Sequence, residues 1–103
     1  MILEHVVLDV APERADSFLE AFRLASPIIA TTDGYIHHEL RRCLETPGRF
    51  LLLVEWVNLD AHMVNFRQSP AYERWRAALH HFYVNKPVVE HFELAYAHTS
   101  PSE

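Results

Sequence analysis

Hydrophobic and polar positions along the chain follow first the period of a strand and then that of a helix. Apolar, largely β-branched residues fill positions 2–10 and stop at Ala11-Pro12, which predicts a strand. Over residues 13–30 apolar side chains recur every three or four positions, which predicts an amphipathic helix. The members of that stripe are Ala15, Phe18, Phe22, Ala25 and Ile29.

The rest of the chain divides at turn-forming and capping residues. Thr32-Asp33-Gly34 and Thr46-Pro47-Gly48 are typical turn sequences, and the segments that follow them are rich in strand-forming residues. Asn58 and Ser69-Pro70 are typical of helix N-termini. We therefore expect strands over 35–44, 49–57 and 88–97, a short helix over 59–67, and a second helix from Ser69-Pro70 to Lys86-Pro87.

The resulting order, β-α-β-β-α-α-β, predicts an α+β fold of the ferredoxin-like, split βαβ type, with its second helix broken in two. A chain of 103 residues suffices for one domain of ordinary size but not for two. We expect a single domain over residues 1–98 and a loose C-terminal tail over 99–103.

The sheet of such a fold carries helices on one face only, so its strands should alternate apolar and polar residues. The segment Phe50–Val57 is instead apolar at nearly every position. An apolar second face would leave a large exposed patch on a small monomer. A second copy of the chain, packed sheet against sheet, would cover it, and we predict a homodimer. A merely apolar strand at the centre of the sheet is the alternative.

Composition excludes several classes of function. Nine Lys and Arg against fourteen Asp and Glu give a net charge of −5, which argues against binding to nucleic acid or to an anionic membrane. Two glycines cannot build a dinucleotide or phosphate loop, and one cysteine cannot form an internal disulfide. No apolar run is long enough to span a membrane and none has the form of a leader, so we expect a cytoplasmic protein.

Eight histidines raise the question of metal binding. His37 and His38 are consecutive on a predicted strand and must point to opposite faces. His80 and His81 lie about 100° apart around a predicted helix. Because no two histidines have the i, i+4 spacing of a helical metal site, we predict no metal and no cofactor, and we expect surface histidines by default.

Two histidines are candidate catalytic residues. His62 lies at helical spacing with Leu59, Met63 and Phe66, so its ring should face inward, and His5 shares a strand face with Leu3 and Val7. If both histidines line one cavity, neutral imidazoles could act there as general bases without a cofactor. A core histidine satisfied by a backbone carbonyl is the structural alternative.

Aromatic residues supply the other half of a possible site. Phe66, Tyr72 and Trp75 project from the broken helix. A helix interrupted at Gln68-Ser69-Pro70 cannot pack as one straight rod, and a flat aromatic ligand could fit beneath the bend. Ordinary core packing would explain the same residues.

One motif carries a resemblance to a known family. Strand Phe50–Val57 is followed by Asp60-Ala61-His62-Met63, Phe66, Ser69-Pro70-x-Tyr72, Trp75 and Leu79, and the stretch Ala-His-x(6)-Ser-Pro-x-Tyr is its most telling part. The last strand opens at Pro87 and carries His91-Phe92-Glu93. Over about residues 2–97 the chain resembles the antibiotic biosynthesis monooxygenase family.

The resemblance implies a dimeric α+β barrel and a pocket between each sheet and its own helices. It implies oxygenation of a small aromatic quinol or polyketide-type phenol without metal or flavin, with His62 as base or proton relay and His5 second. Tyr72 and Trp75 would orient and stack the substrate ring, and Phe66 would wall the cavity. Haem-degrading relatives use an Asn, a Trp and a His at the positions where this chain has His5, Phe66 and Arg76. Because all three residues differ, the resemblance does not imply haem degradation. An isomerase or a small-ligand-binding protein of the same fold is the alternative.

Overall fold

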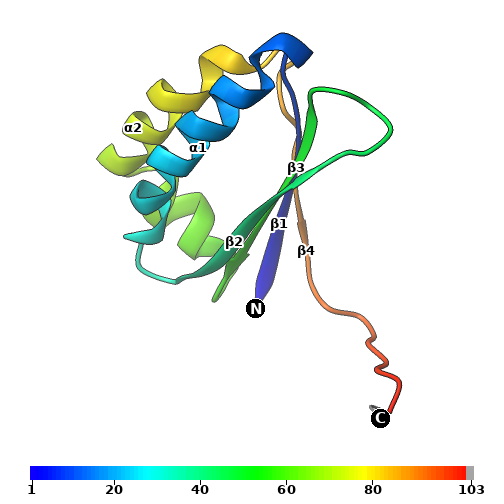
Figure 1. Ribbon diagram of the computed structural model, residues 1–103. Helices are drawn as coiled ribbons and strands as arrows, with labels where there is room; N and C mark the ends of the chain where they lie inside the picture. The colour runs from blue at the N-terminus through cyan, green and yellow to red at the C-terminus, as the bar shows by residue number, and fades with distance from the viewer. Residues whose placement is uncertain (102–103) are drawn as a thin grey trace.

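The computed structural model describes residues 1–101 and consists of one sheet with all its helices on one face (Figure 1). The strands are β1 (Ile2–Asp9), β2 (Tyr35–Arg42), β3 (Arg49–Trp56) and β4 (Val89–Phe92). The helical segments are η1 (Pro12–Arg14), α1 (Ala15–Ala30), η2 (Ala61–Phe66), α2 (Pro70–Leu79) and η3 (His80–Phe82). No helix within this described part of the chain is long and apolar enough to cross a membrane.

The sheet has the strand order β2-β3-β1-β4, and every neighbouring pair is antiparallel. Because side chains alternate across a strand, the register of β1 with β3 puts Val6 and Leu52 on the face beneath the helices. Leu53 pairs with His5 and therefore lies on the opposite face. The predicted ferredoxin-like α+β fold is confirmed.

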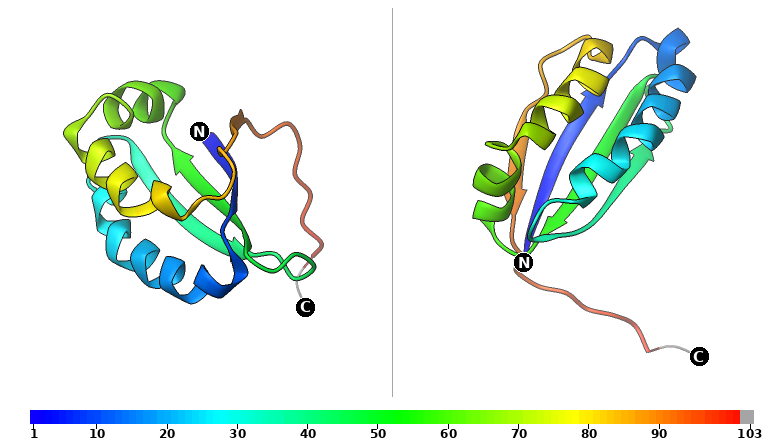
Figure 2. Two further views of the ribbon diagram at one scale, coloured as in Figure 1. Left: turned by 90° about the horizontal axis from the view of Figure 1, so that it is seen from above. Right: turned by 90° about the vertical axis from the view of Figure 1, so that its left-hand side faces the viewer.

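The core lies between the helix-covered face of the sheet and the two helices α1 and α2, which run side by side over it (Figure 2). Trp56, Phe18 and Phe50 are among its largest fully buried side chains. The predicted stripe of α1 is buried as expected: Ala15, Phe18, Phe22, Ala25 and Ile29. Burial of these side chains supplies the main free energy that holds the two layers together.

The predicted last strand is too long. The sequence predicts a strand over residues 88–97, but β4 ends at Phe92, which pairs with Leu3 near the beginning of β1. Beyond that point β1 offers almost no backbone to pair with, so the chain leaves the sheet in extended form (Figure 1). Residues 93–101 form no helix or strand, and residues 102–103 of the predicted tail over 99–103 lie outside the described part.

The predicted helix starts agree closely with the structure. The side chain of Asn58 accepts a hydrogen bond from the Ala61 N–H at 2.9 Å, and that of Ser69 accepts one from the Tyr72 N–H at 3.2 Å. The predicted α-helix over 13–30 begins as a 3₁₀ turn, and the final helix changes to 3₁₀ geometry after Leu79. The short helix has π geometry, in which the Arg67 N–H donates to the His62 carbonyl at 2.9 Å.

Gly34 lets the turn after α1 approach the helix that carries His62. Its φ of +92° is strained for any other residue, and a Cβ there would lie 2.6 Å from the Cβ of Ala61. We expect Gly34→Ala to lower the free energy of unfolding by about 1–3 kcal/mol. Urea denaturation measures the loss, with the exposed neighbour Asp33→Ala as the control. Unchanged stability of Gly34→Ala would show that this contact is not required.

Candidate functional site

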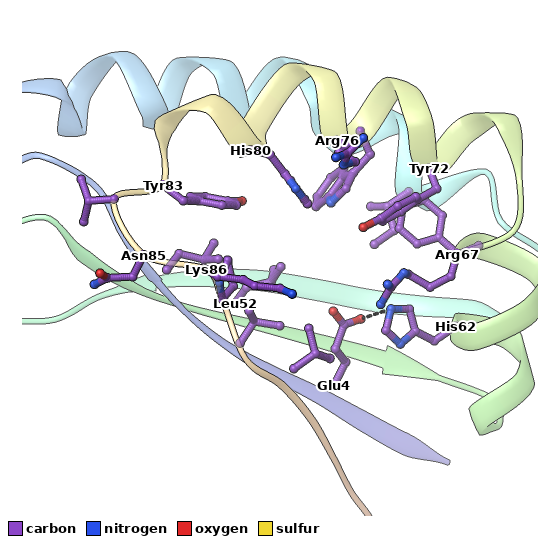
Figure 3. Close-up of a pocket in the computed structure, with 18 residues that line it drawn as sticks. Glu4, Leu52, His62, Arg67, Tyr72, Arg76, His80, Tyr83, Asn85 and Lys86 are labelled. Carbon is purple, nitrogen blue, oxygen red and sulfur yellow. Dashed lines mark ion pairs between the residues drawn. The ribbon is translucent and has the colours of Figure 1, made fainter.

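A cavity of about 500 Å³ opens between the helix-covered face of the sheet and the second helical layer (Figure 3). Its floor comes from β1 and β3, and its roof comes from η2, α2 and the segment that follows η3. About half of the lining residues are apolar and the other half are polar or charged. The polar and charged members are Glu4, His62, Arg67, Tyr72, Arg76, His80, Tyr83, Asn85 and Lys86.

Glu4 is the acidic group on the floor of the cavity. Its residue surface is only 6% exposed, and its carboxylate points up into the cavity (Figure 3). Trp56 Nε1 donates a hydrogen bond to Glu4 Oε1 at 3.0 Å. Burial raises the pKa of Glu4 to about 7, although the bond from Trp56 and the charge of Arg67 act in the opposite direction. Glu4 therefore exchanges a proton near neutral pH.

His62 lies beside Glu4, with Nε2 3.4 Å from Glu4 Oε1. The π-helical turn brings its ring over Trp56, where the two rings stack at 5.2 Å between centroids. Its Nδ1 is hydrogen-bonded to Nε2 of His91 in β4 at 2.8 Å. Burial lowers the pKa of His62 to about 4, with repulsion from His91 and Arg67 adding to the shift, so the ring is neutral at pH 7.

These three side chains form a line from the cavity to the edge of the sheet. Glu4 Oε1 is held by Trp56 and lies next to His62, which leaves Glu4 Oε2 free to face a ligand. Because His91 is only partly buried, the line leads from a buried carboxyl group toward solvent. A proton taken up by Glu4 thus has neighbouring nitrogen atoms along which it can leave.

The predicted aromatic residues meet at one end of the cavity. The rings of Phe66 and Tyr72 are 5.4 Å apart in an edge-to-face arrangement, and Trp75 packs 6.0 Å from Phe66. Phe66 and Trp75 are nearly fully buried, whereas Tyr72 is half-buried. All three line the cavity together with His62. They form an apolar wall against which a flat ring could pack.

His5 does not line this cavity. It lies on the uncovered face of the sheet, where its ring contacts Phe92 edge-on at 5.4 Å. The expectation that His5 and His62 share one cavity is therefore wrong, because Glu4, not His5, points toward the helices. The expectation that the histidines lie at the surface by default is also wrong for His38, because its ring is half-buried and hydrogen-bonded to Ser26 and Tyr35.

Among the titratable groups at the site, Glu4, His80 and His91 were not predicted from the sequence to be site residues. One of them left a signal, because Glu4 occupies the same alternating face as Val6 and Leu8. An acid at a buried strand position requires a partner or a function. Nothing in the sequence indicates that His91 reaches His62, because that contact depends on the pairing of β4 with β1.

Metal binding has no geometric support in the described residues 1–101, where no three His, Cys, Asp or Glu side chains converge in a way that could hold an ion. Glu4, His62 and His91 form a line rather than a cluster around one point. The polar groups of the cavity wall are therefore available to a ligand or to one another. No buried side-chain nitrogen or oxygen in this part of the chain lacks a hydrogen-bond partner.

Comparison with known proteins places the chain in a family. The family model described as antibiotic biosynthesis monooxygenase matches residues 1–78, which is most of the chain. The chain belongs to the antibiotic biosynthesis monooxygenase family. The matched region includes η2 and nearly all of α2, and so includes the part of the cavity roof from His62 to Arg76.

Three relatives show the range of similarity. The uncharacterized protein YczJ of Bacillus subtilis is 44% identical over 93 residues, which span 90% of this chain and 98% of YczJ. A crystal structure from Bordetella bronchiseptica, assigned to the same family, has a TM-score of 0.87 at 32% identity and covers 92% of this chain and 97% of its own. SnoaB of Streptomyces nogalater, a cofactor-independent oxygenase, has a TM-score of 0.77 at 17% identity over 93% of this chain and 94% of its own, a likeness of fold.

Proposed function

We propose that the protein is a cofactor-independent monooxygenase that acts on a small aromatic quinol or phenol. The observation that carries this proposal is a buried carboxyl group that titrates near pH 7, set beside His62 in a cavity with an aromatic wall. Family membership and the fold shared with SnoaB support it. The single cysteine, Cys43, is free, in keeping with the reducing cytoplasm in which we place the protein.

Glu4 and His62 supply what such a reaction needs from the protein. Molecular oxygen reacts readily only with an electron-rich donor, and a phenol becomes one when it loses its proton. Glu4 takes this proton at Oε2, and His62 holds the carboxylate in place and passes the proton toward His91. The anion gives two electrons to oxygen and forms a C–O bond at a ring carbon that bears hydrogen, which yields a hydroperoxide after protonation. That carbon then loses its hydrogen as a proton while the O–O bond breaks, so the carbon becomes a carbonyl and the second oxygen atom leaves as water.

The aromatic residues position the substrate in this proposal. Tyr72 and Trp75 orient and stack the ring, and Phe66 walls the cavity. The surrounding apolar surface lowers the local polarity and favours a charge-delocalised anion over a localised one. His5 lies on the other face of the sheet and takes no part in its own chain's cavity.

Incubation with hydroquinones, naphthoquinols and anthrones tests the proposal. We expect oxygen uptake equal to product formed, and one atom from labelled oxygen gas in each product molecule. Conversion that proceeds equally well without oxygen would identify an isomerase of the same cavity. If no compound is converted but some raise the melting temperature, the protein is a ligand-binding member of the family.

We also propose that the protein is a homodimer whose sheets pack face to face. The uncovered face of the sheet carries apolar side chains from three strands. Val7 is 39% and Phe92 48% exposed, and Leu3, Leu51 and Leu53 surround them without full burial. A second copy of the same face would remove this patch from water.

Charging the centre of this patch should separate the two copies. Wild-type protein is expected to have a mass of about 24 kDa in light scattering, twice the 12.0 kDa of one chain. We expect Leu53→Glu to give a monomer or insoluble protein, because a buried unpaired carboxylate is costly. The matched control is Leu24→Glu, at a position 64% exposed on α1, which should remain dimeric. A wild-type monomer at micromolar concentration would contradict the proposed assembly.

A further inference from the structure

The cavity wall is positively charged although the chain as a whole is acidic. Of the nine Lys and Arg residues in the sequence, Arg67, Arg76 and Lys86 line this one cavity. Of the fourteen Asp and Glu residues, Glu4 alone does so among residues 1–101. Two other surface hollows have acidic residues in their walls, such as Asp16 and Glu20 in one and Glu55 and Glu93 in the other. The positive charge is therefore a local property of this site.

Two of these cations, Arg67 and Lys86, form no ion pair within the described residues 1–101, although the charge of Arg67 acts to lower the pKa of Glu4 in the same cavity. Arg76 lies 3.9 Å from the exposed Glu73, a weak surface pair. In Figure 3 the side chains of Arg67 and Lys86 extend into the cavity region from opposite sides.

Arg67 is held at the cavity by its neighbours. Its guanidinium carbon lies 5.0 Å from the centre of the Tyr72 ring, the geometry of a cation–π contact. Its charge helps to lower the pKa of His62, His80 and His91, after burial in each case. The positive field of Arg67 thus reaches across the cavity, and a second cation from Lys86 adds to it.

Cations that form no ion pair, set beside the aromatic wall of a cavity, favour an anionic ligand. Arg pairs with a planar carboxylate or with a phosphate through two parallel hydrogen bonds, and Lys adds a point charge. We propose that the cavity binds an aromatic ligand that carries a carboxylate or phosphate substituent, which Arg67 and Lys86 bind while the ring packs against Phe66 and Tyr72. This proposal rests on the function proposed above and narrows its substrate class to anionic aromatics.

Binding of matched naphthalene compounds, measured by calorimetry under nitrogen, tests the proposal without turnover. The probes are 1-hydroxy-2-naphthoate, its neutral isostere 1-hydroxy-2-naphthamide, 1-naphthyl phosphate and 1-naphthol. We expect at least one of the two anions to bind about ten-fold more tightly than its neutral counterpart, with an affinity that falls as salt rises. The naphthoate and phosphate arms show which anion the site prefers.

Variants identify the residues responsible. In Arg67→Gln combined with Lys86→Gln we expect the preference for the anion to fall to within about two-fold, with the affinity for the neutral compound retained. Arg74→Gln is the matched control, because it removes one positive charge from α2 outside the cavity lining. If the double variant does not fold, Lys86→Gln alone should still weaken binding of the anion and leave binding of the neutral compound unchanged.

Three results would overturn the proposal. Equal affinity for anionic and neutral probes would show that Arg67 and Lys86 do not select an anionic substituent. A preference that survives in the double variant would place the anion elsewhere. If none of the four probes binds, both the proposed binding of an aromatic ligand in the cavity and the oxygenase proposal are contradicted. In a parallel incubation in air, tight binding of 1-hydroxy-2-naphthoate without oxygen uptake would contradict the oxygenase proposal alone.

Discussion

Replacement of Glu4 by Gln is expected to lower turnover by roughly 10²–10⁴-fold, the usual weight of a general base. Gln keeps the hydrogen bond that Glu4 accepts from Trp56, so the packing of the cavity floor should persist. It cannot accept a proton. The wild-type rate should rise with pH through a single group near 7, the pKa of the buried carboxyl group, and this rise should be absent in Glu4→Gln.

The corresponding variant His62→Gln distinguishes whether Glu4 or His62 is the base. His62 is neutral above its pKa of about 4, so it cannot produce a rise in rate near pH 7. We expect His62→Gln to lower turnover by a smaller factor and to keep the rise, because burial continues to raise the pKa of Glu4. His5→Gln, on the far face of the sheet, is the control and should leave the pH profile unchanged.

The opposite pattern would reassign the base. Loss of the rise in His62→Gln, with its retention in Glu4→Gln, would make the imidazole the proton acceptor. Loss of the rise in His5→Gln would instead indicate that the uncovered face of the sheet contributes to a site between two copies. Melting temperatures of all three variants show whether a loss of turnover reflects a loss of fold.

Periodicity was sufficient to predict the fold because each element buries one face. The apolar stripe of α1 follows from packing against a single core layer. Element ends that depend on local chemistry were also predictable, as Ser69 and Pro70 show at the start of α2. The end of β4 was not, because it depends on where the partner strand β1 begins.

Only part of the candidate site could be predicted from the sequence. The spacing of His62 and Phe66 predicts an inward face of the short helix, and the structure places both side chains in the cavity wall. Glu4 was overlooked because its partners, Trp56 and His62, lie more than fifty residues away and reach it only through the pairing of β1 with β3. The choice of His5 over Glu4 amounts to selecting the wrong face of one strand, which periodicity alone cannot decide when both faces are apolar.

Glu4 and His62 should make the stability of the protein depend on pH in opposite directions. The folded pKa of Glu4, about 7, is above its ordinary value of 4.5, so the native state binds more protons than the unfolded state between these pH values. This contribution to the free energy of unfolding therefore falls as pH rises through that window. The folded pKa of His62, about 4, is below its ordinary 6.5, so its contribution falls as pH drops from 6.5 to 4.

In the wild type the two trends largely cancel between pH 4.5 and 6.5, and single variants should reveal each one. Burial, the main cause of both shifts, persists when the other residue is replaced. Relative to the wild type, Glu4→Gln should gain roughly 2 kcal/mol of stability from pH 4.5 to 6.5, and His62→Gln should lose a similar amount. Urea denaturation of the three proteins at pH 4.5, 5.5 and 6.5 measures both slopes, and the comparison at each pH removes the contributions of all other groups. Slopes of the same sign in the two variants would mean that Glu4 and His62 are not both neutral in the folded protein at pH 5.5, and the proton-accepting role of Glu4 near pH 7 would lose its basis.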